Sequence, residues 1–195
     1  MDTSFGALMG LVRDTVTDPR AGARTILRAR LGMDVRWLAL ALVVVLSVLL
    51  GQLTLQLMLG PSGMMGGVLS GPVASLMLQG GVLMFMVFTV HTVGRWMGGG
   101  GSFPDALLLM VVLQGIMVLI QVLQIAAMLL LPPLAGILGL IGFGVFLWVL
   151  TGFVAELHGF RSLLAVFGMI LATAFGVAFL IAMMLAMLGV TPPQA

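Results

Sequence analysis

Long apolar segments fill the chain after residue 36, and short runs of glycine, proline and charged residues separate them. A helix needs about 20 mainly apolar residues to cross the hydrocarbon core of a membrane. The segments that meet this length are residues 37–59, 73–94, 105–131, 134–155 and 162–188. The pattern therefore predicts an all-α, polytopic membrane protein with five transmembrane helices, preceded by an amphipathic N-terminal arm.

The breaks between these segments carry turn signals. They are G-P-S-G at 60–63, Gly71-Pro72, the glycines at 98–101, Pro132-Pro133 and E-L-H-G-F-R at 156–161. The proline pair is ambiguous, because it can also kink a single long helix. Charge decides between five spans and four: five spans place every Arg on one side of the membrane, whereas four would place Arg161 on the other.

Charge also divides the chain into a cytoplasmic arm, residues 1–36, and a membrane domain, residues 37–195. Ten of the fourteen charged side chains precede Trp37. Because short loops rich in Arg stay in the cytoplasm, we expect a cytoplasmic N-terminus and a periplasmic C-terminus. A cleaved signal peptide is disfavoured, since about 36 polar or mixed residues precede the first apolar run.

Composition agrees with this membrane assignment. The chain is 62% hydrophobic and 7% charged, whereas soluble domains carry roughly a quarter charged residues. It has no Cys, which excludes disulfides and thiolate chemistry. All eight basic residues are Arg, and this bias, with the high Ala, Leu and Gly content, indicates a bacterial protein of the inner membrane.

The arm has two expected helices. Apolar residues recur at helical spacing at Phe5, Leu8, Met9, Val12 and Val16. Asp18-Pro19 then predicts the start of a second helix that runs to about residue 31. The residues expected to face anionic lipid headgroups are Arg20, Arg24, Arg28, Arg30 and Arg36. Nucleic acid is a poor alternative, because the basic stripe is short and joined directly to a membrane span.

Inside the spans, small and amide side chains favour helix packing, and no charged residue lies in the middle of a span. The small residues expected at helix contacts are Gly136, Gly139, Gly142, Gly168, Ala172 and Gly176. The glutamines Gln114, Gln121 and Gln124 have two interpretations. They form hydrogen bonds between helices, or they line a polar pathway for a transported or lipid-like ligand.

Candidate chemistry is sparse. His91, Glu156 and His158 could lie at the same membrane face, so a metal site is a weak candidate. The motifs H-E-x-x-H and G-x-S-x-G and a phosphate-binding loop are absent from the sequence. We therefore expect no enzyme activity, no cofactor and no metal.

The glycines at 98–101 need a separate explanation. Glycine tolerates positive φ, so the run predicts a short turn between two spans. Ser102-Phe103-Pro104-Asp105 then resembles a capping box that starts the third span. A hinge and a ligand-binding loop are the alternatives to a simple turn.

The arm motif D-P-R-A-G-A-R, the loop G-G-G-G-S-F-P-D-A-L and the loop E-L-H-G-F-R-S-L-L, with five spans, resemble the Yip-one domain family in a bacterial form. The resemblance implies a small five-span helical protein and supplies no catalytic residues. Eukaryotic members act in vesicle trafficking and associate with Rab-type GTPases and with one another.

These observations lead to two functional expectations. The first is a membrane-organising or adaptor protein that works through helix and loop contacts, with a second copy or another membrane protein as partner. The second is a transporter or lipid-handling protein that uses the glutamine-bearing helix faces.

Replacement of Arg20, Arg24 and Arg28 by Gln is expected to weaken binding of the isolated 1–36 segment to anionic liposomes. Each basic residue near such a surface contributes about 1 kcal/mol. Co-sedimentation with liposomes measures the effect, and unchanged binding would exclude lipid contact by this stripe.

Overall fold

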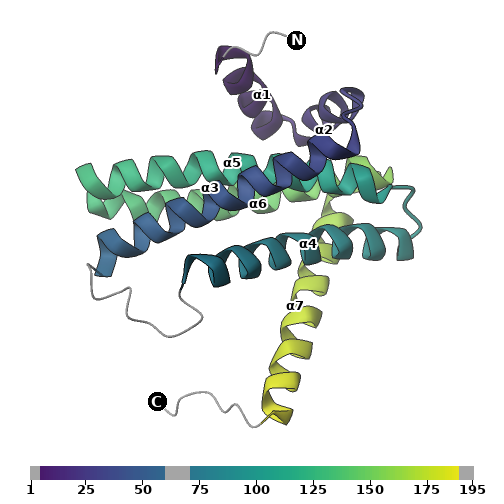
Figure 1. Ribbon diagram of the computed structural model, residues 1–195. Coiled ribbons are helices and arrows are strands. Elements are labelled where there is room, and N and C mark those ends of the chain that lie inside the picture. The colour runs from purple at the N-terminus through teal and green to yellow at the C-terminus, as the bar shows by residue number, and fades with distance from the viewer. Residues whose placement is uncertain (1–4, 60–70, 189–195) are drawn as a thin grey trace.

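The computed structural model describes residues 5–59 and 71–188, and within them it contains seven helices and no strand (Figure 1). The helices are α1 (Phe5–Thr17), α2 (Pro19–Arg28), α3 (Met33–Leu59), α4 (Pro72–Trp96), α5 (Phe103–Leu130), α6 (Pro132–His158) and α7 (Leu163–Met187). The helices α3 to α7 are long and apolar enough to cross a membrane. The predicted all-α fold with five spans is confirmed, whereas the G-P-S-G break at 60–63 lies outside the described residues.

Helix α5 is the centre of the bundle. It contacts α3, α4 and α6, and these four helices lie side by side (Figure 1). Helix α7 contacts mainly α6 and points away from the rest. In the most apolar 18-residue stretch of α5, 50% of the residues are buried, compared with 6% in the corresponding stretch of α7. Helix α7 therefore has few contacts with the other helices and is exposed over most of its length.

The predicted helix starts are present. Ser102 caps α5: its Oγ accepts a hydrogen bond from the Asp105 backbone N–H at 3.3 Å and donates to Asp105 Oδ2 at 2.7 Å. Asp18 caps α2 by accepting from the Ala21 N–H at 3.0 Å. Pro132 begins α6, and Leu131 before it has a non-helical backbone, so the proline pair separates two helices rather than kinking one.

Some of the predicted small residues pack inside the bundle and others face outward. A Cβ at Gly139 would lie 3.1 Å from Gln124 Nε2, and one at Gly142 would lie 3.0 Å from Ile120 Cγ2, so both glycines allow α6 to approach α5 closely. Gly136, Gly168 and Gly176 have no such neighbour, and Ala172 is exposed. Any packing role for these four residues requires a partner outside the described part of the chain.

The glutamines join neighbouring helices. Gln114 Nε2 donates to Ser47 Oγ on α3 at 2.8 Å, and the Gln121 amide lies 3.8 Å from the place of a Cβ at Gly51, also on α3. Gln124 instead faces α6 at Gly139. Gln114 is therefore engaged in a hydrogen bond between helices. The alternative, in which the three side chains line a polar pathway, stays a prediction.

Arg36 differs from its expected position at the lipid surface. It lies in the first turn of α3, where its side chain is buried and forms an ion pair with Asp105 Oδ1 at 3.1 Å. Its Nε also donates to the Leu31 carbonyl at 2.9 Å. A buried guanidinium needs such partners, because leaving a charge unpaired in an apolar interior is costly. The pair ties the start of α3 to the start of α5.

Replacement of Arg36 by Met is expected to lower the unfolding free energy by about 2 kcal/mol, because it leaves Asp105 without its cation. The loss is smaller than for a fully buried pair, since the Asp105 side chain is 38% exposed to solvent. Denaturant titration in mixed micelles measures the change. Replacement of the exposed Arg28 by Met is the control, and an equal effect of the two variants would contradict a stabilising pair.

Candidate functional site at the charged end of the bundle

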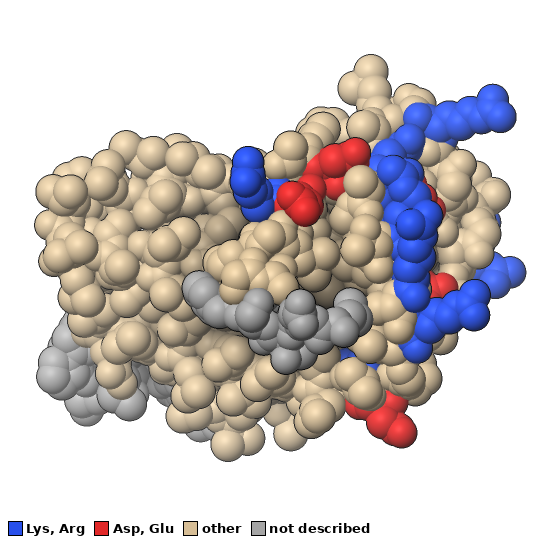
Figure 2. Space-filling view, turned by 90° about the horizontal axis from the view of Figure 1, so that it is seen from above, with Lys and Arg blue, Asp and Glu red and all other residues tan. Residues whose placement is uncertain are grey.

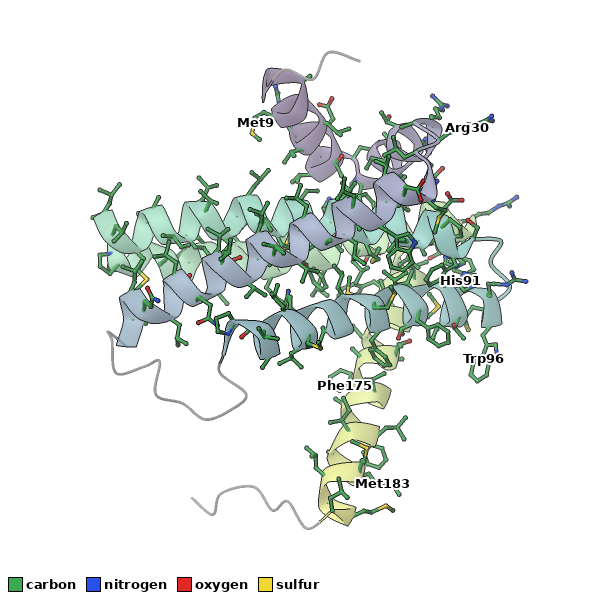
Figure 3. All side chains as sticks on the ribbon, in the orientation of Figure 1. Met9, Arg30, His91, Trp96, Phe175 and Met183 are labelled. Carbon is green, nitrogen blue, oxygen red and sulfur yellow. The ribbon has the colours of Figure 1, made fainter. Side chains whose placement is uncertain are left out.

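The charged side chains gather toward one end of the helix bundle, which we name the charged end. Figure 2 shows Arg, Asp and Glu over the middle and the right of the molecule, whereas its left end shows only uncharged or undescribed residues. This end holds the end of α4, the glycine loop, the start of α5 and the end of α6. His91, Trp96 and Arg30 also lie toward it (Figure 3).

His158 is enclosed by the glycine loop. It is buried at the end of α6, and a Cβ at Gly94 or Gly99 would overlap its side chain. A Cβ at Gly101 would lie 2.9 Å from His158 Nε2 and 2.7 Å from Leu157 Cγ. The Gly100 N–H donates to the His158 carbonyl at 3.4 Å. These glycines therefore allow the chain to fold closely around one imidazole.

Two histidines at this end have buried ring nitrogens that lack hydrogen-bond partners among the described residues. These nitrogens are His158 Nε2 and His91 Nδ1. The other nitrogen of His158 lies 3.2 Å from the Val154 carbonyl, and the ring stacks on Phe160 with centroids 5.6 Å apart. His91 meets Phe103 edge to face at 5.9 Å. Both imidazoles are thus held by aromatic contacts.

The N-terminal arm is fastened to α6 and to the connection that follows it. Arg24 forms an ion pair with Glu156 Oε2 at 3.1 Å. Arg20 donates to the carbonyl of Phe160 and, at 3.3 Å, to that of Arg161. Closer to the middle of α6, Trp148 Nε1 donates to the Val16 carbonyl at 3.0 Å.

Close packing completes this attachment. Gly152 on α6 lies against Pro19, so a Cβ there would overlap the proline ring. The apolar residues Val12 and Val16 of α1 pack against the core, whereas the side chains of residues 5 and 8 lie outside the described part. The arm is therefore part of the folded domain rather than a separate tail.

The weak metal candidates do not form a ligand set. Glu156 is occupied by Arg24, and the described residues contain no group of three or more His, Asp or Glu side chains that could hold a metal ion. His91 and His158 both lie at the charged end, but a third ligand is missing among the residues described. The arrangement offers contacts and charge for binding. In the described part of the chain, no nucleophile forms a hydrogen bond to a base.

The Arg residues expected to face lipid divide into two groups. Arg20, Arg24 and Arg36 make contacts within the protein, whereas Arg28 and Arg30 are exposed and form no ion pair among the described residues. The Arg24 side chain is also 48% exposed. Lipid contact by the exposed Arg residues stays a prediction. The docking of Arg24 on Glu156 was missed, although a lone carboxylate among apolar spans is a signal that a cation lies near it.

Comparison with known families gives one match. The family model described as the Yip1 domain matches residues 13–192, which is nearly the whole chain. No curated protein and no solved structure matches. The matched range includes the last part of α1, all of α2 and all five candidate spans.

Replacement of Gly94 by Ala is expected to lower the unfolding free energy by about 1–3 kcal/mol, because the new methyl group overpacks against the His158 ring. Gly99, Gly101 and Phe160 surround that ring, so it has little room to move aside. Without this overlap, Ala in a helix would instead stabilise by up to about 1 kcal/mol.

The Gly100 to Ala replacement is the matched control for this experiment. Its Cβ would have no neighbour within 4 Å, and we expect a change below about 0.5 kcal/mol. In a double-mutant cycle, Gly94→Ala should cost much less in a His158→Ala background than in the wild type, because the overlap is gone. Equal effects at positions 94 and 100 would contradict the enclosure of His158.

Proposed function

The chain belongs to the Yip1 domain family, and from this membership we propose that it is a non-enzymatic membrane-organising or adaptor protein. It acts by holding partners at the charged end and along exposed helix faces. The family supports a multi-pass membrane protein, and five apolar helices agree with it. Neither a substrate nor a cofactor is needed for this role.

The observation that carries this proposal is the joining of three distant segments into one surface. The arm, the glycine loop and the connection from α6 to α7 are linked by the Arg24–Glu156 pair, by Arg20 and by the Gly100 bond to His158. A surface assembled before a partner arrives loses little entropy on binding. Such a preformed surface suits recognition of a protein or a membrane better than catalysis.

The same surface presents side chains with no partner inside the described part of the chain. Arg28 and Arg30 are exposed on the arm, and Trp96 at the end of α4 is 86% exposed. Cations attract anionic headgroups or acidic partners, and Trp is common both at membrane interfaces and at binding hot spots. We propose that the Arg pair contacts anionic lipid while the neighbouring surface receives the partner.

We also propose the orientation and the compartment. The charged end faces the cytoplasm of a bacterial cell, the protein lies in the inner membrane, and the C-terminus is periplasmic. The support is the distribution of Arg residues, which favours the cytoplasmic side of a membrane. The charge-free end then faces the periplasm.

A second contact surface is proposed on α7. Gly168, Ala172 and Gly176 form a stripe of small residues at i, i+4 and i+8, and all three are exposed. Such stripes allow two membrane helices to approach closely. A second copy of the chain or a span of a membrane partner would complete that contact.

Purification from native membranes at native expression level, followed by mass spectrometry, tests the adaptor role. We expect a protein that co-purifies in a fixed ratio with the chain. Two variants locate the contact: charge reversal of Arg28 and Arg30 alters the arm, and replacement of Gly168 and Gly176 by Leu alters α7. Recovery of the partner should fall about tenfold in one of them, the loss expected for one hot-spot contact.

The two variants serve as controls for each other, because each leaves the other surface intact. Undiminished recovery with both variants, or purification of wild-type chain without any stoichiometric protein, would contradict the adaptor role.

A further inference from the structure

An apolar cleft lies between α4, α6 and α7. Its cavity of about 480 Å³ is lined by residues between 82 and 94 on α4, between 143 and 154 on α6 and between 169 and 181 on α7. Among the described residues of the lining, the polar side chains are Thr89 and Thr173. Thr173 already donates to the Met169 carbonyl at 2.8 Å. The walls therefore offer almost nothing to a polar or charged ligand.

The cleft continues along α4 and α7. A second cavity of about 460 Å³ shares Val82, Phe85, Val177 and Ile181 with the first and extends to Met77. From residue 94 to residue 77 the cleft follows α4 for about 25 Å at 1.5 Å per residue. This length is close to the roughly 30 Å thickness of the hydrocarbon core. Figure 3 shows why the space exists: α7, marked by Phe175 and Met183, extends away from α4.

The walls of the cleft suit a hydrocarbon chain. An acyl chain needs no hydrogen-bond partner from the walls, and the chains of the surrounding bilayer already lie at this depth. A span of another protein and a second copy of the chain are the alternative occupants, and the test below distinguishes them.

Positive charge at one end of the cleft indicates the class of lipid whose acyl chain would bind there. Arg161 immediately precedes the start of α7, and Arg95 lies in the last turn of α4. Both are exposed, and neither has a carboxylate within ion-pair distance among the described residues. Trp96 directly follows Arg95 in the chain, and Trp is enriched in the headgroup layer.

We propose that the cleft binds an acyl chain of an anionic phospholipid, with its phosphate at the charged end near Arg95 and Arg161. The lipid fills the space between α7 and the other helices and joins α7 to the bundle. The walls of the cleft are separate from the partner surface proposed above, and the phosphate end borders that surface at Trp96 and Arg161. Neither proposal depends on the other.

Native mass spectrometry of the full chain tests the site. The detergent-purified protein is mixed with phosphatidylglycerol carrying palmitoyl and oleoyl chains, and the retained lipid is measured. We expect one strongly retained lipid on the wild-type chain. Ala174 lines the cleft, and its replacement by Phe should lower the affinity about tenfold, because the ring fills the space of the chain.

Ala186 provides the matched control, since it lies on the same helix, is also exposed, does not line either cavity and is not part of the small-residue stripe of α7. Its replacement by Phe should leave lipid retention unchanged. Ala178 also lines the cleft, and Ala178→Phe gives the same test if Ala174→Phe does not survive purification. Replacement of Arg95 and Arg161 by Gln should remove the preference for phosphatidylglycerol over phosphatidylcholine.

Several results would overturn the proposal. They are equal lipid retention by the wild-type, Ala174→Phe and Ala178→Phe proteins, equal loss with the Ala186→Phe control, and an unchanged lipid preference after removal of both Arg side chains. A dimer that dissociates in Ala174→Phe would identify a second copy as the occupant instead. Partner recovery from native membranes is measured separately, so failure of the lipid site leaves the adaptor proposal standing.

Discussion

A charge inside an apolar bundle must be paired, and this constraint shapes the charged end. Arg36 is buried where α3 meets α5, and Asp105 is the carboxylate that compensates it. The same Asp105 carboxylate also accepts a hydrogen bond from the Ser102 hydroxyl, so the ion pair and the helix cap share one residue. Because α5 is the central helix, this unit fixes where α3 starts against the core and where the glycine loop must end.

The glycine loop and the arm are built onto that fixed end. Close packing around His158 brings the loop against α6, and the Arg24–Glu156 pair brings the arm against the same helix. Segments that are separated by more than a hundred residues thus present one surface. Helix α7 is the exception, since it lies largely outside the bundle and leaves an apolar cleft. We interpret the surface formed by the glycine loop and the arm as a site for a partner, and the cleft beside α7 as a site for lipid.

The sequence predicted the elements better than their contacts. Five spans follow from apolar length, and the caps at Asp18 and Ser102 follow from local chemistry that needs no tertiary structure. The glycine loop was correctly expected to be a turn, but its reason is partly tertiary: Gly98 has a positive φ, whereas Gly99 and Gly101 make room for a histidine 57 to 59 residues away. The burial of Arg36 and the divergence of α7 depend on how the helices pack. These spans are apolar on every face, so their sequence does not indicate which face contacts a neighbour.

The most direct test of the account is whether the arm is docked on α6 in the membrane. The chain contains no Cys, so a pair of cysteines at Arg24 and Glu156 can be joined by a short bifunctional thiol reagent in native membranes. The Arg13 and Glu156 pair is the comparison, since the Arg13 side chain is exposed and makes no ion pair in the described part of the chain. We predict efficient cross-linking within one chain for the 24–156 pair and little for the 13–156 pair. Equal and low cross-linking of both pairs would contradict a preassembled surface and, with it, the proposed mode of partner binding.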